Sequence, residues 1–169
     1  MDYLSTLAEE LGVALKARGF MLVLAESCTG GMVAQAVTSV AGSSAWFDRG
    51  FVTYSNIAKI EMLGVSPQTL EKFGAVSEDV AAQMALGCLK LGMRKNSHAQ
   101  IAGSITGIAG PDGGTAEKPV GTVCFAWANL NQPILTATQI FSGNRQEIRQ
   151  QATAFMLARL IARLNDLES

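Results

Sequence analysis

Helical patterns and short strand-like runs alternate along the chain, and this alternation restricts the fold more than any other feature. Leucines recur from Leu4 to Leu15 at the three- and four-residue spacing of an amphipathic helix, which ends near Gly19. The continuous apolar run 20–25 follows and is typical of a short buried strand. Helices interleaved with strands in this way predict an α/β layered domain.

The remaining expected elements continue the alternation. Further strands are predicted at residues 51–54, 100–106, 120–128 and 135–141, and further helices at residues 32–40, 56–64, 67–74, 77–91 and 146–164. The connection between the last two strands, residues 129–133, is too short for a crossover. These strands must therefore pair antiparallel, and we expect a mixed sheet. No repeat or linker-like segment divides the 169 residues, so we expect one domain spanning 1–169.

Composition excludes several classes of protein. Thirteen basic and fourteen acidic residues give a formal charge of −1, without a basic patch that could follow a phosphate backbone, so we expect no nucleic-acid partner. Apolar runs are too short to span a membrane, and the N-terminus lacks a signal-peptide pattern, so we expect no membrane association and a cytoplasmic location. Cys28, Cys88 and Cys124 are widely spaced, which indicates reduced thiols rather than disulfides or a zinc site.

A polar, glycine-containing segment directly after the first strand is the first candidate for chemistry. Open α/β sheets bind ligands at the carboxyl ends of their strands. Here Ser27 and Thr29 stand at a strand-to-helix turn, and Gly30 and Gly31 leave backbone N–H groups uncovered. Such a turn can hold a nucleophile and an oxyanion together, although a simple helix cap has the same composition.

A second candidate is the long loop 106–115, which contains four glycines. It matches neither a P-loop nor a dinucleotide-binding G-x-G-x-x-G turn. Its backbone N–H groups could surround an anion, with threonine hydroxyls as additional donors, but ordinary turn chemistry also explains the glycines.

A serine nucleophile needs a base, and the sequence restricts the choice. The one histidine, His98, precedes the third strand, at the end opposite to the 106–115 loop, so a Ser-His-Asp triad is not expected. Lys59 lies one helical turn beyond Asn56, and its amine and the Tyr54 hydroxyl could face the same crevice. To act as a base, Lys59 needs its pKa lowered from ~10.4 to roughly 7 or 8 by burial or neighbouring cations. A solvated helix lysine is the alternative.

Three further side chains could contribute to the chemistry of such a site. Arg145, at the beginning of the last helix, could bind a carboxylate or phosphate, or lie free on the surface. Cys28 could replace Ser27 as the nucleophile, or pack as a small buried side chain. Glu26 could orient Lys59 as a charge partner.

Several motifs in fixed order resemble one family. They are AESCTGG from Ala25, YSN-x-x-K from Tyr54 to Lys59, GAVSE from Gly74, and TGIAGPDGGT from Thr106 with KPVGTV beyond it. Together they resemble the C-terminal domain of the competence/damage-inducible protein CinA, whose active members are nicotinamide-nucleotide amidohydrolases, and the similarity extends from about residue 22 to 149.

The resemblance implies a fold, an activity and a set of site residues. The implied fold is a three-layer α/β/α sandwich around a mixed, mostly parallel sheet of about five strands, in a homo-oligomer, with a dimer favoured. The implied reaction hydrolyses the carboxamide of nicotinamide mononucleotide, a small-molecule substrate, without metal or cofactor. Ser27 corresponds to the nucleophile, and Tyr54 and Lys59 to its activating pair. The implied substrate-binding residues are Glu26, Thr29, Gly30, Gly31, Asn56, Thr106, Gly107, Gly110 and Arg145.

Two alternatives to that activity remain open at the level of the sequence. Stand-alone relatives of this kind can be paralogues with little or no amidase activity, which would make the chain a nucleotide-binding or competence- or DNA-damage-related interaction module. The substrate could also be a different small carboxamide.

Overall fold

A computed structural model describes residues 2–93 and 98–167 of the chain. Within these residues, the helices are α1 (Tyr3–Arg18), α2 (Met32–Thr38), α3 (Asn56–Leu63), α4 (Pro67–Phe73), α5 (Glu78–Gly92) and α6 (Arg145–Asp166), with a 3-10 turn at Ser43–Ala45. The strands in the same part of the chain are β1 (Met21–Glu26), β2 (Phe47–Val52), β3 (Ala99–Gly107), β4 (Thr122–Asn129) and β5 (Leu135–Ile140).

The strands form a single mixed sheet in the order β2-β1-β3-β4-β5. β1 pairs in parallel with both β2 and β3, whereas β3–β4 and β4–β5 are antiparallel. The antiparallel pairing of β4 and β5, expected from their short connection, is confirmed. Parallel pairing is confined to the three strands β2, β1 and β3, whose carboxyl ends therefore meet at one edge of the sheet.

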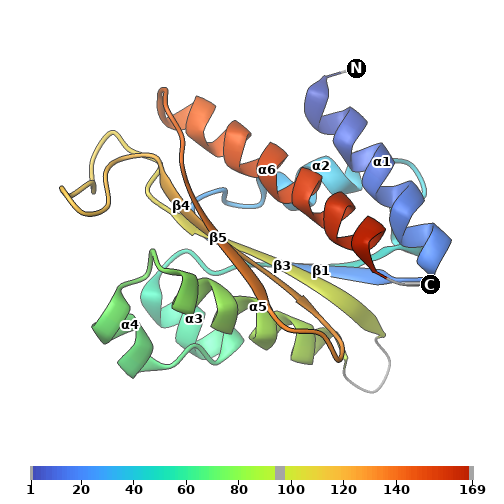
Figure 1. Ribbon diagram of the computed structural model, residues 1–169, viewed down its shortest axis with the longest axis horizontal. Helices are drawn as coiled ribbons and strands as arrows, with labels where there is room; N and C mark the ends of the chain where they lie inside the picture. The colour runs from blue at the N-terminus through green and yellow to red at the C-terminus, as the bar shows by residue number, and fades with distance from the viewer. Residues whose placement is uncertain (1, 94–97, 168–169) are drawn as a thin grey trace.

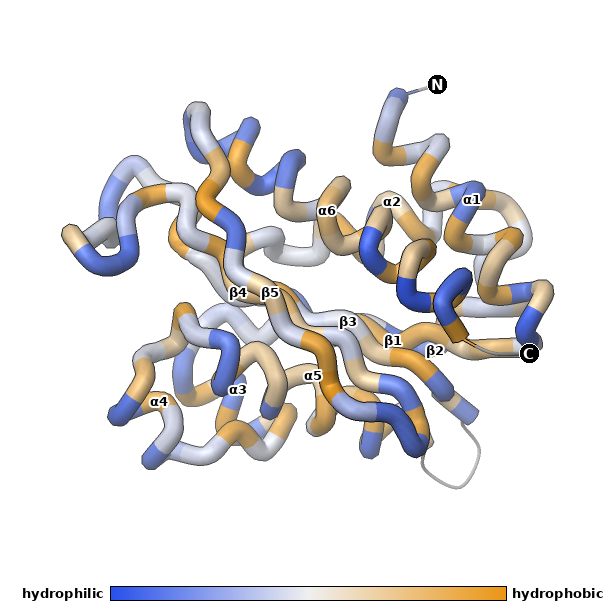
Figure 2. The backbone as a smooth tube through the Cα atoms, viewed as in Figure 1, coloured by the Kyte–Doolittle hydropathy of each residue, from blue (hydrophilic) through white to orange (hydrophobic). Residues whose placement is uncertain are grey.

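Helices cover both faces of the sheet, as the three-layer interpretation expects. Figure 1 shows α1, α2 and α6 on one face and α3, α4 and α5 on the other. Alternate residues of β1 enter the two cores: Leu22 and Leu24 pack toward the first group of helices, and Val23 and Ala25 toward the second. The hydropathy colouring in Figure 2 shows apolar residues recurring along the strands between the helical layers.

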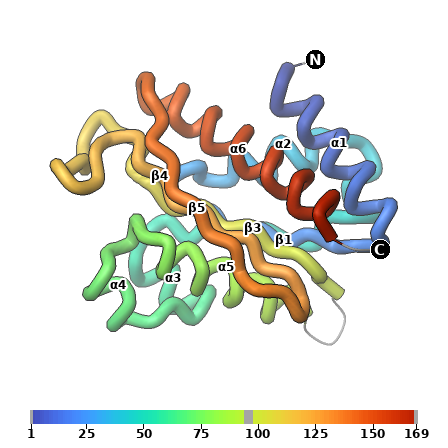
Figure 3. Tube along the Cα trace, viewed as in Figure 1, coloured from blue at the N-terminus to red at the C-terminus, as the bar shows by residue number. Residues whose placement is uncertain are grey.

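The first and last helices pack against each other on one face of the sheet (Figure 3). α1 begins at the N-cap Asp2, whose side chain accepts a hydrogen bond from the Ser5 N–H, and ends at Gly19 with a φ of 65°. The end near Gly19 is the one expected from the leucine pattern. Because α6 crosses this face, its first turn reaches the carboxyl edge of the sheet.

The second strand lies earlier in the chain than the sequence indicates. β2 covers Phe47–Val52, not residues 51–54, and its register places Phe47 beside Leu22 and Val52 beside Glu26. The strand is hard to recognise from residue propensities because it contains Asp48, Arg49 and Gly50. Such residues are tolerated here because β2 is an edge strand. Of the four residues that suggested a strand, Phe51 and Val52 do end β2, whereas Thr53 and Tyr54 form the segment leading into α3.

No helix in the described ranges 2–93 and 98–167 is long and apolar enough to cross a membrane.

Candidate active site

Ser27 lies at the carboxyl edge of the sheet, one residue beyond the end of β1. Its N–H donates to the Ile105 carbonyl of β3, 3.0 Å away, which extends the strand pairing and fixes the backbone. Gly30 and Gly31 follow with φ angles of 60° and 101°, a conformation that favours glycine. The chain can therefore turn sharply from β1 into α2, and it leaves the Ser27 side chain 7% exposed.

The Lys59 amine meets the Ser27 hydroxyl. Lys59 lies in α3, which is capped by the Ser55 side chain accepting a hydrogen bond from the Ala58 N–H. Its Nζ atom lies 3.0 Å from the Ser27 Oγ atom, 2.9 Å from the Thr53 carbonyl oxygen and 3.0 Å from the Tyr54 carbonyl oxygen. A hydroxyl and two carbonyl groups thus surround the amine.

Burial lowers the pKa of the Lys59 amine below its ordinary value, because removal from water disfavours the charged form. The side chain is 1% exposed. No acidic side chain within residues 2–93 and 98–167 forms a salt bridge with it. Burial therefore makes this amine easier to deprotonate than an exposed lysine, and the neutral amine is the form that accepts a proton.

Glu26 does not act as the charge partner of Lys59. Its carboxylate is 2% exposed and accepts hydrogen bonds from the Thr29 hydroxyl at 2.7 Å, the Val33 N–H at 2.9 Å and the Ala34 N–H at 3.0 Å. These contacts hold the turn and the first N–H groups of α2. The side chains of Glu26 and Thr29 are thus used within the protein and do not reach the surface where a substrate would bind.

The Tyr54 hydroxyl hydrogen-bonds to Arg145 of α6 and not to the Ser27–Lys59 pair. It accepts a hydrogen bond from Nη2 of Arg145 at 3.1 Å, and Nη1 of the same guanidinium donates to the Gly110 carbonyl at 2.7 Å. Within the described residues the hydroxyl forms no hydrogen bond with Ser27 or Lys59. Tyr54 reaches the pair through its backbone carbonyl, which accepts from Ser27 Oγ at 3.3 Å.

Arg149 is a site residue that the sequence analysis missed. Its Nε atom donates to the Cys28 carbonyl at 3.1 Å, and its Nη2 atom to the Thr29 carbonyl at 3.0 Å. The side chain thus holds the two residues that follow the nucleophile. Its position four residues after Arg145, on the same face of α6, is the signal that could have identified it.

The glycine-rich loop contributes less than its composition suggests. Thr106 is 1% exposed, and its hydroxyl donates to the Ala75 carbonyl at 2.9 Å, so it is not brought to the exposed side of the site. A side chain at Gly107 would lie 2.8 Å from Val123, 3.0 Å from the Thr122 carbonyl oxygen and 3.1 Å from the Cys28 sulfur, so glycine permits the close approach of β3 to β4 and to the turn. Gly110 has a φ of 79° and offers its carbonyl to Arg145.

Cys28 packs in the core as the alternative interpretation expects. It is 6% exposed within the cluster between the sheet and α2 and α6, and burial raises the pKa of its thiol to about 12. The thiolate required of a nucleophile is therefore disfavoured. Cys88 and Cys124 are also buried.

Three of the remaining candidate residues are exposed. Gly30 and Asn56 are exposed near the pair, Asn56 as the first residue of α3. His98 is exposed at the amino end of β3, far along the strand from this edge, as expected. No group of three or more histidine, cysteine or acidic side chains able to bind a metal occurs in the described part of the chain.

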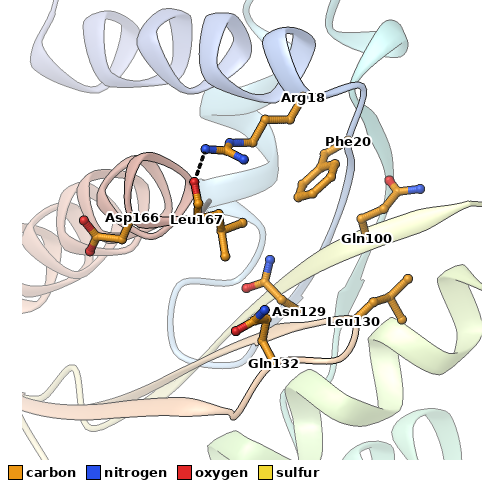
Figure 4. A pocket seen from close by; sticks show the side chains of 8 residues that line it. All are labelled: Arg18, Phe20, Gln100, Asn129, Leu130, Gln132, Asp166 and Leu167. Carbon is orange, nitrogen blue, oxygen red and sulfur yellow. Dashed lines mark hydrogen bonds between the residues drawn. The ribbon is translucent and has the colours of Figure 1, made fainter. Parts of the chain in front are cut away.

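A cavity of about 640 Å³ lies at the opposite edge of the sheet. Figure 4 shows its lining residues, Arg18, Phe20, Gln100, Asn129, Leu130, Gln132, Asp166 and Leu167. Arg18 donates to the Leu167 carbonyl there, at 2.6 Å. The lining contains no serine, cysteine or lysine, so it offers no nucleophile paired with an amine base. The Ser27–Lys59 pair is the stronger candidate for catalysis.

Comparison with known proteins gives a consistent picture. Nicotinamide-nucleotide amidohydrolase PncC of Enterobacter agglomerans is 58% identical over 154 residues, covering 91% of both chains. The protein of the same name from Escherichia coli (strain K12) is 55% identical over 157 residues, covering 93% of this chain and 92% of the relative. The crystal structure of the competence/damage inducible protein CihA from Agrobacterium tumefaciens superposes with a TM-score of 0.91 at 46% identity, over 98% of both chains.

The family assignment rests on nearly the whole chain. Residues 4–164, which include every candidate site residue from Glu26 to Arg149, match the CinA C-terminal domain. The order of motifs, the fold and the close relatives agree, and this chain is therefore a member of the CinA C-terminal domain family.

Proposed function

We propose that residues 1–169 act as one amidohydrolase domain that converts nicotinamide mononucleotide to nicotinate mononucleotide and ammonia in pyridine nucleotide salvage. The observation that supports this most is the 3.0 Å contact between Lys59 Nζ and Ser27 Oγ in a buried setting. The names of the relatives that are 55% and 58% identical supply the substrate.

In the first step, Ser27 is the nucleophile and neutral Lys59 is the base. When the neutral amine donates its two N–H groups to the Thr53 and Tyr54 carbonyls, its lone pair can accept the Ser27 hydroxyl proton across the 3.0 Å Nζ–Oγ contact once that hydroxyl turns from the Tyr54 carbonyl. Lys59 removes the hydroxyl proton as Oγ forms a bond to the carboxamide carbon. The Tyr54 hydroxyl is not needed as a relay, because the amine reaches Oγ directly.

The tetrahedral oxyanion needs nearby N–H donors. The Gly30 N–H already donates to the Ser27 carbonyl at 3.0 Å. The N–H groups of Cys28 and Thr29 donate to no acceptor within residues 2–93 and 98–167, and we assign the oxyanion to them.

The protonated amine then completes the reaction. It gives its proton to the leaving nitrogen as the C–N bond breaks, and ammonia departs. Lys59, neutral again, removes a proton from water, whose oxygen attacks the acyl carbon. The ester bond to Ser27 breaks, Oγ recovers its proton from Lys59, and the pyridine carboxylate is released.

Arg145 provides the grip on the substrate phosphate. A guanidinium has five N–H donors, and Arg145 uses two of them within the protein, on Gly110 and Tyr54. The others can bind a phosphate at the exposed beginning of α6, and backbone N–H groups near Gly30 and Gly31 lie on the same edge. Binding energy gained there orients the amide, so free nicotinamide should be a far poorer substrate.

The test is incubation of the purified protein with nicotinamide mononucleotide, followed by detection of ammonia and nicotinate mononucleotide. Turnover with at least about 10²-fold lower kcat/KM for free nicotinamide supports the proposal. Thermal stabilisation by the nucleotide without turnover would instead favour a binding module. Ammonia release from another carboxamide, and not from nicotinamide mononucleotide, would show that the substrate is a different carboxamide.

A further inference from the structure

Tyr54 is held both at its backbone carbonyl, beside the nucleophile, and at its side-chain hydroxyl. Its backbone carbonyl accepts from Ser27 Oγ at 3.3 Å and from Lys59 Nζ at 3.0 Å, and its hydroxyl accepts from Arg145 Nη2 at 3.1 Å. Tyr54 therefore contacts the reacting hydroxyl through its backbone and the guanidinium at the beginning of α6 through its side chain. Its orientation is fixed without burial in the core.

The ring is open to a ligand. Tyr54 is 58% exposed. Every stacked or edge-on pair of rings within the described residues involves Phe125, Trp127, Phe141 or Phe155, and the cations over rings lie on Phe73 and Phe155. No aromatic or cationic side chain of that part of the protein thus occupies the Tyr54 ring.

The nearby charges also suit a cationic ring. Burial lowers the pKa of the Lys59 amine beside the nucleophile, which weakens its repulsion of a positive substrate. The Arg145 guanidinium contacts Tyr54 at the hydroxyl, and not over the ring. The Glu26 carboxylate lies one residue before the nucleophile and has no salt-bridge partner within residues 2–93 and 98–167.

We propose that Tyr54 is a specificity-determining residue, whose ring binds the positively charged pyridinium of an N-alkylated pyridine carboxamide in preference to an uncharged aromatic carboxamide. The inference rests on the proposed function, since it concerns the same substrate site. When the carboxamide carbon reaches Ser27 Oγ, the attached ring must lie close to the residues that contact Oγ. An aromatic face within about 6 Å of a cation attracts it.

The experiment compares two substrates that differ mainly in ring charge. Nicotinamide mononucleotide carries a pyridinium, and benzamide riboside 5′-monophosphate has an uncharged ring with the same carboxamide and phosphate. The ratio of their kcat/KM values is measured for the wild type and for the Tyr54→Phe and Tyr54→Leu variants. Differences in amide reactivity cancel when ratios are compared between variants.

We expect Tyr54→Leu to reduce the preference for the cationic substrate by about tenfold, mainly through the KM for nicotinamide mononucleotide, and Tyr54→Phe to keep the preference. The matched control is Tyr3→Leu, which removes the other tyrosine of the chain, 67% exposed on α1, and should leave both substrates unaffected.

Two results would overturn the inference. If both Tyr54 variants lose kcat equally on both substrates, the hydroxyl acts in proton transfer. If Tyr54→Leu loses activity with an unchanged ratio, the residue only supports the fold. A wild type that turns over neither compound contradicts the proposed function instead, and the ratio of the two dissociation constants, measured by calorimetry, then tests the ring separately.

Discussion

Lys59 and Ser27 are 32 residues apart in sequence, yet the Lys59 Nζ atom lies 3.0 Å from the Ser27 Oγ atom. The lysine is almost completely buried, and no acidic side chain in the described part of the chain forms a salt bridge with it. The pairing depends on two successive parallel strands, β1 and β2, ending at the same edge of the sheet. Four of the following predictions test this pairing or the residues that support it.

Removal of the nucleophile should abolish the reaction and preserve the fold. We expect Ser27→Ala to lower kcat by at least about 10³-fold, because no other group on the turn can form the acyl-enzyme. Circular dichroism and Tm should remain near the wild-type values. Cys28→Ala is the matched control, and it should keep turnover within about tenfold. The assignment is wrong if the loss occurs with Cys28→Ala and not with Ser27→Ala.

The activity should rise with pH. Only the neutral Lys59 amine accepts the Ser27 proton, so kcat/KM should increase as Lys59 deprotonates and level off above its pKa. Burial sets that midpoint below the ordinary 10.5. The Cys28 thiol, with a pKa of about 12, does not titrate in this range. Lys59→Arg keeps a cation that cannot deprotonate and should be inactive at every pH, and an active Lys59→Arg variant would exclude the base role.

The same amine should make stability depend on pH. The folded-state pKa of Lys59 is lower than the unfolded value, so the unfolded chain binds more protons between the two pKa values. The free energy of unfolding contributed by Lys59 therefore rises with pH from the folded pKa up to about 10.5. The buried thiols of Cys28 and Cys88 have the opposite effect: their contribution to the free energy of unfolding falls as the pH rises above 9.0, because burial raises their pKa in the folded state. The difference between wild type and Lys59→Met in urea unfolding isolates the lysine contribution, and a flat difference would contradict it.

Arg149 should affect the rate more than substrate binding. It holds the carbonyl groups of Cys28 and Thr29, so its loss should misalign the turn and lower kcat by about 10- to 100-fold, with KM changed little. Arg149→Met tests this. Arg149→Lys should recover only part of the loss, because a single ammonium cannot reproduce the two hydrogen bonds that the guanidinium donates to the Cys28 and Thr29 carbonyls. Arg159→Met, on the same helix but stacked on Phe155, is the control. An increase in KM alone would show that Arg149 contacts the substrate.

The Glu26 carboxylate should be important for stability. In the wild type, the Thr29 hydroxyl and two N–H groups of α2 share the two oxygens of the Glu26 carboxylate. Glu26→Gln replaces one of these oxygens with an NH2 group, so at least one buried donor loses its acceptor. We expect a decrease of about 1–3 kcal/mol in the free energy of unfolding, measured by urea denaturation. A stability within error of the wild type would show that water replaces the carboxylate.

The sequence predicts the framework of the fold well because hydrophobic periodicity reports burial. The leucines of α1, the apolar run of β1 and the short β4–β5 connection each identify an element or a pairing that the structure contains. It places β2 too late, because an edge strand tolerates Asp48, Arg49 and Gly50, and these weaken the pattern. Burial of a strand on both faces is visible in sequence, whereas pairing at an edge is not.

Some residues of the candidate site could be predicted from the sequence, and others could not. Ser27 and Lys59 follow from chemistry, since one hydroxyl and one amine stand at neighbouring strand ends. The direction of the Tyr54 side chain does not follow, because it is fixed by Arg145, 91 residues away. Arg149 escaped notice because hydrogen bonding to backbone carbonyls leaves no motif. The homo-oligomer and the cytoplasmic location expected from the sequence remain predictions.

The position of α6 has a consequence for synthesis of the protein. Ser27 precedes Arg145 and Arg149 in the chain, and these two α6 residues hold Tyr54, Gly110 and the turn after the nucleophile. A nascent chain therefore carries its reactive hydroxyl in an incomplete setting until α6 has been synthesised. Enzymatic competence should consequently appear only after α6 has docked against the sheet.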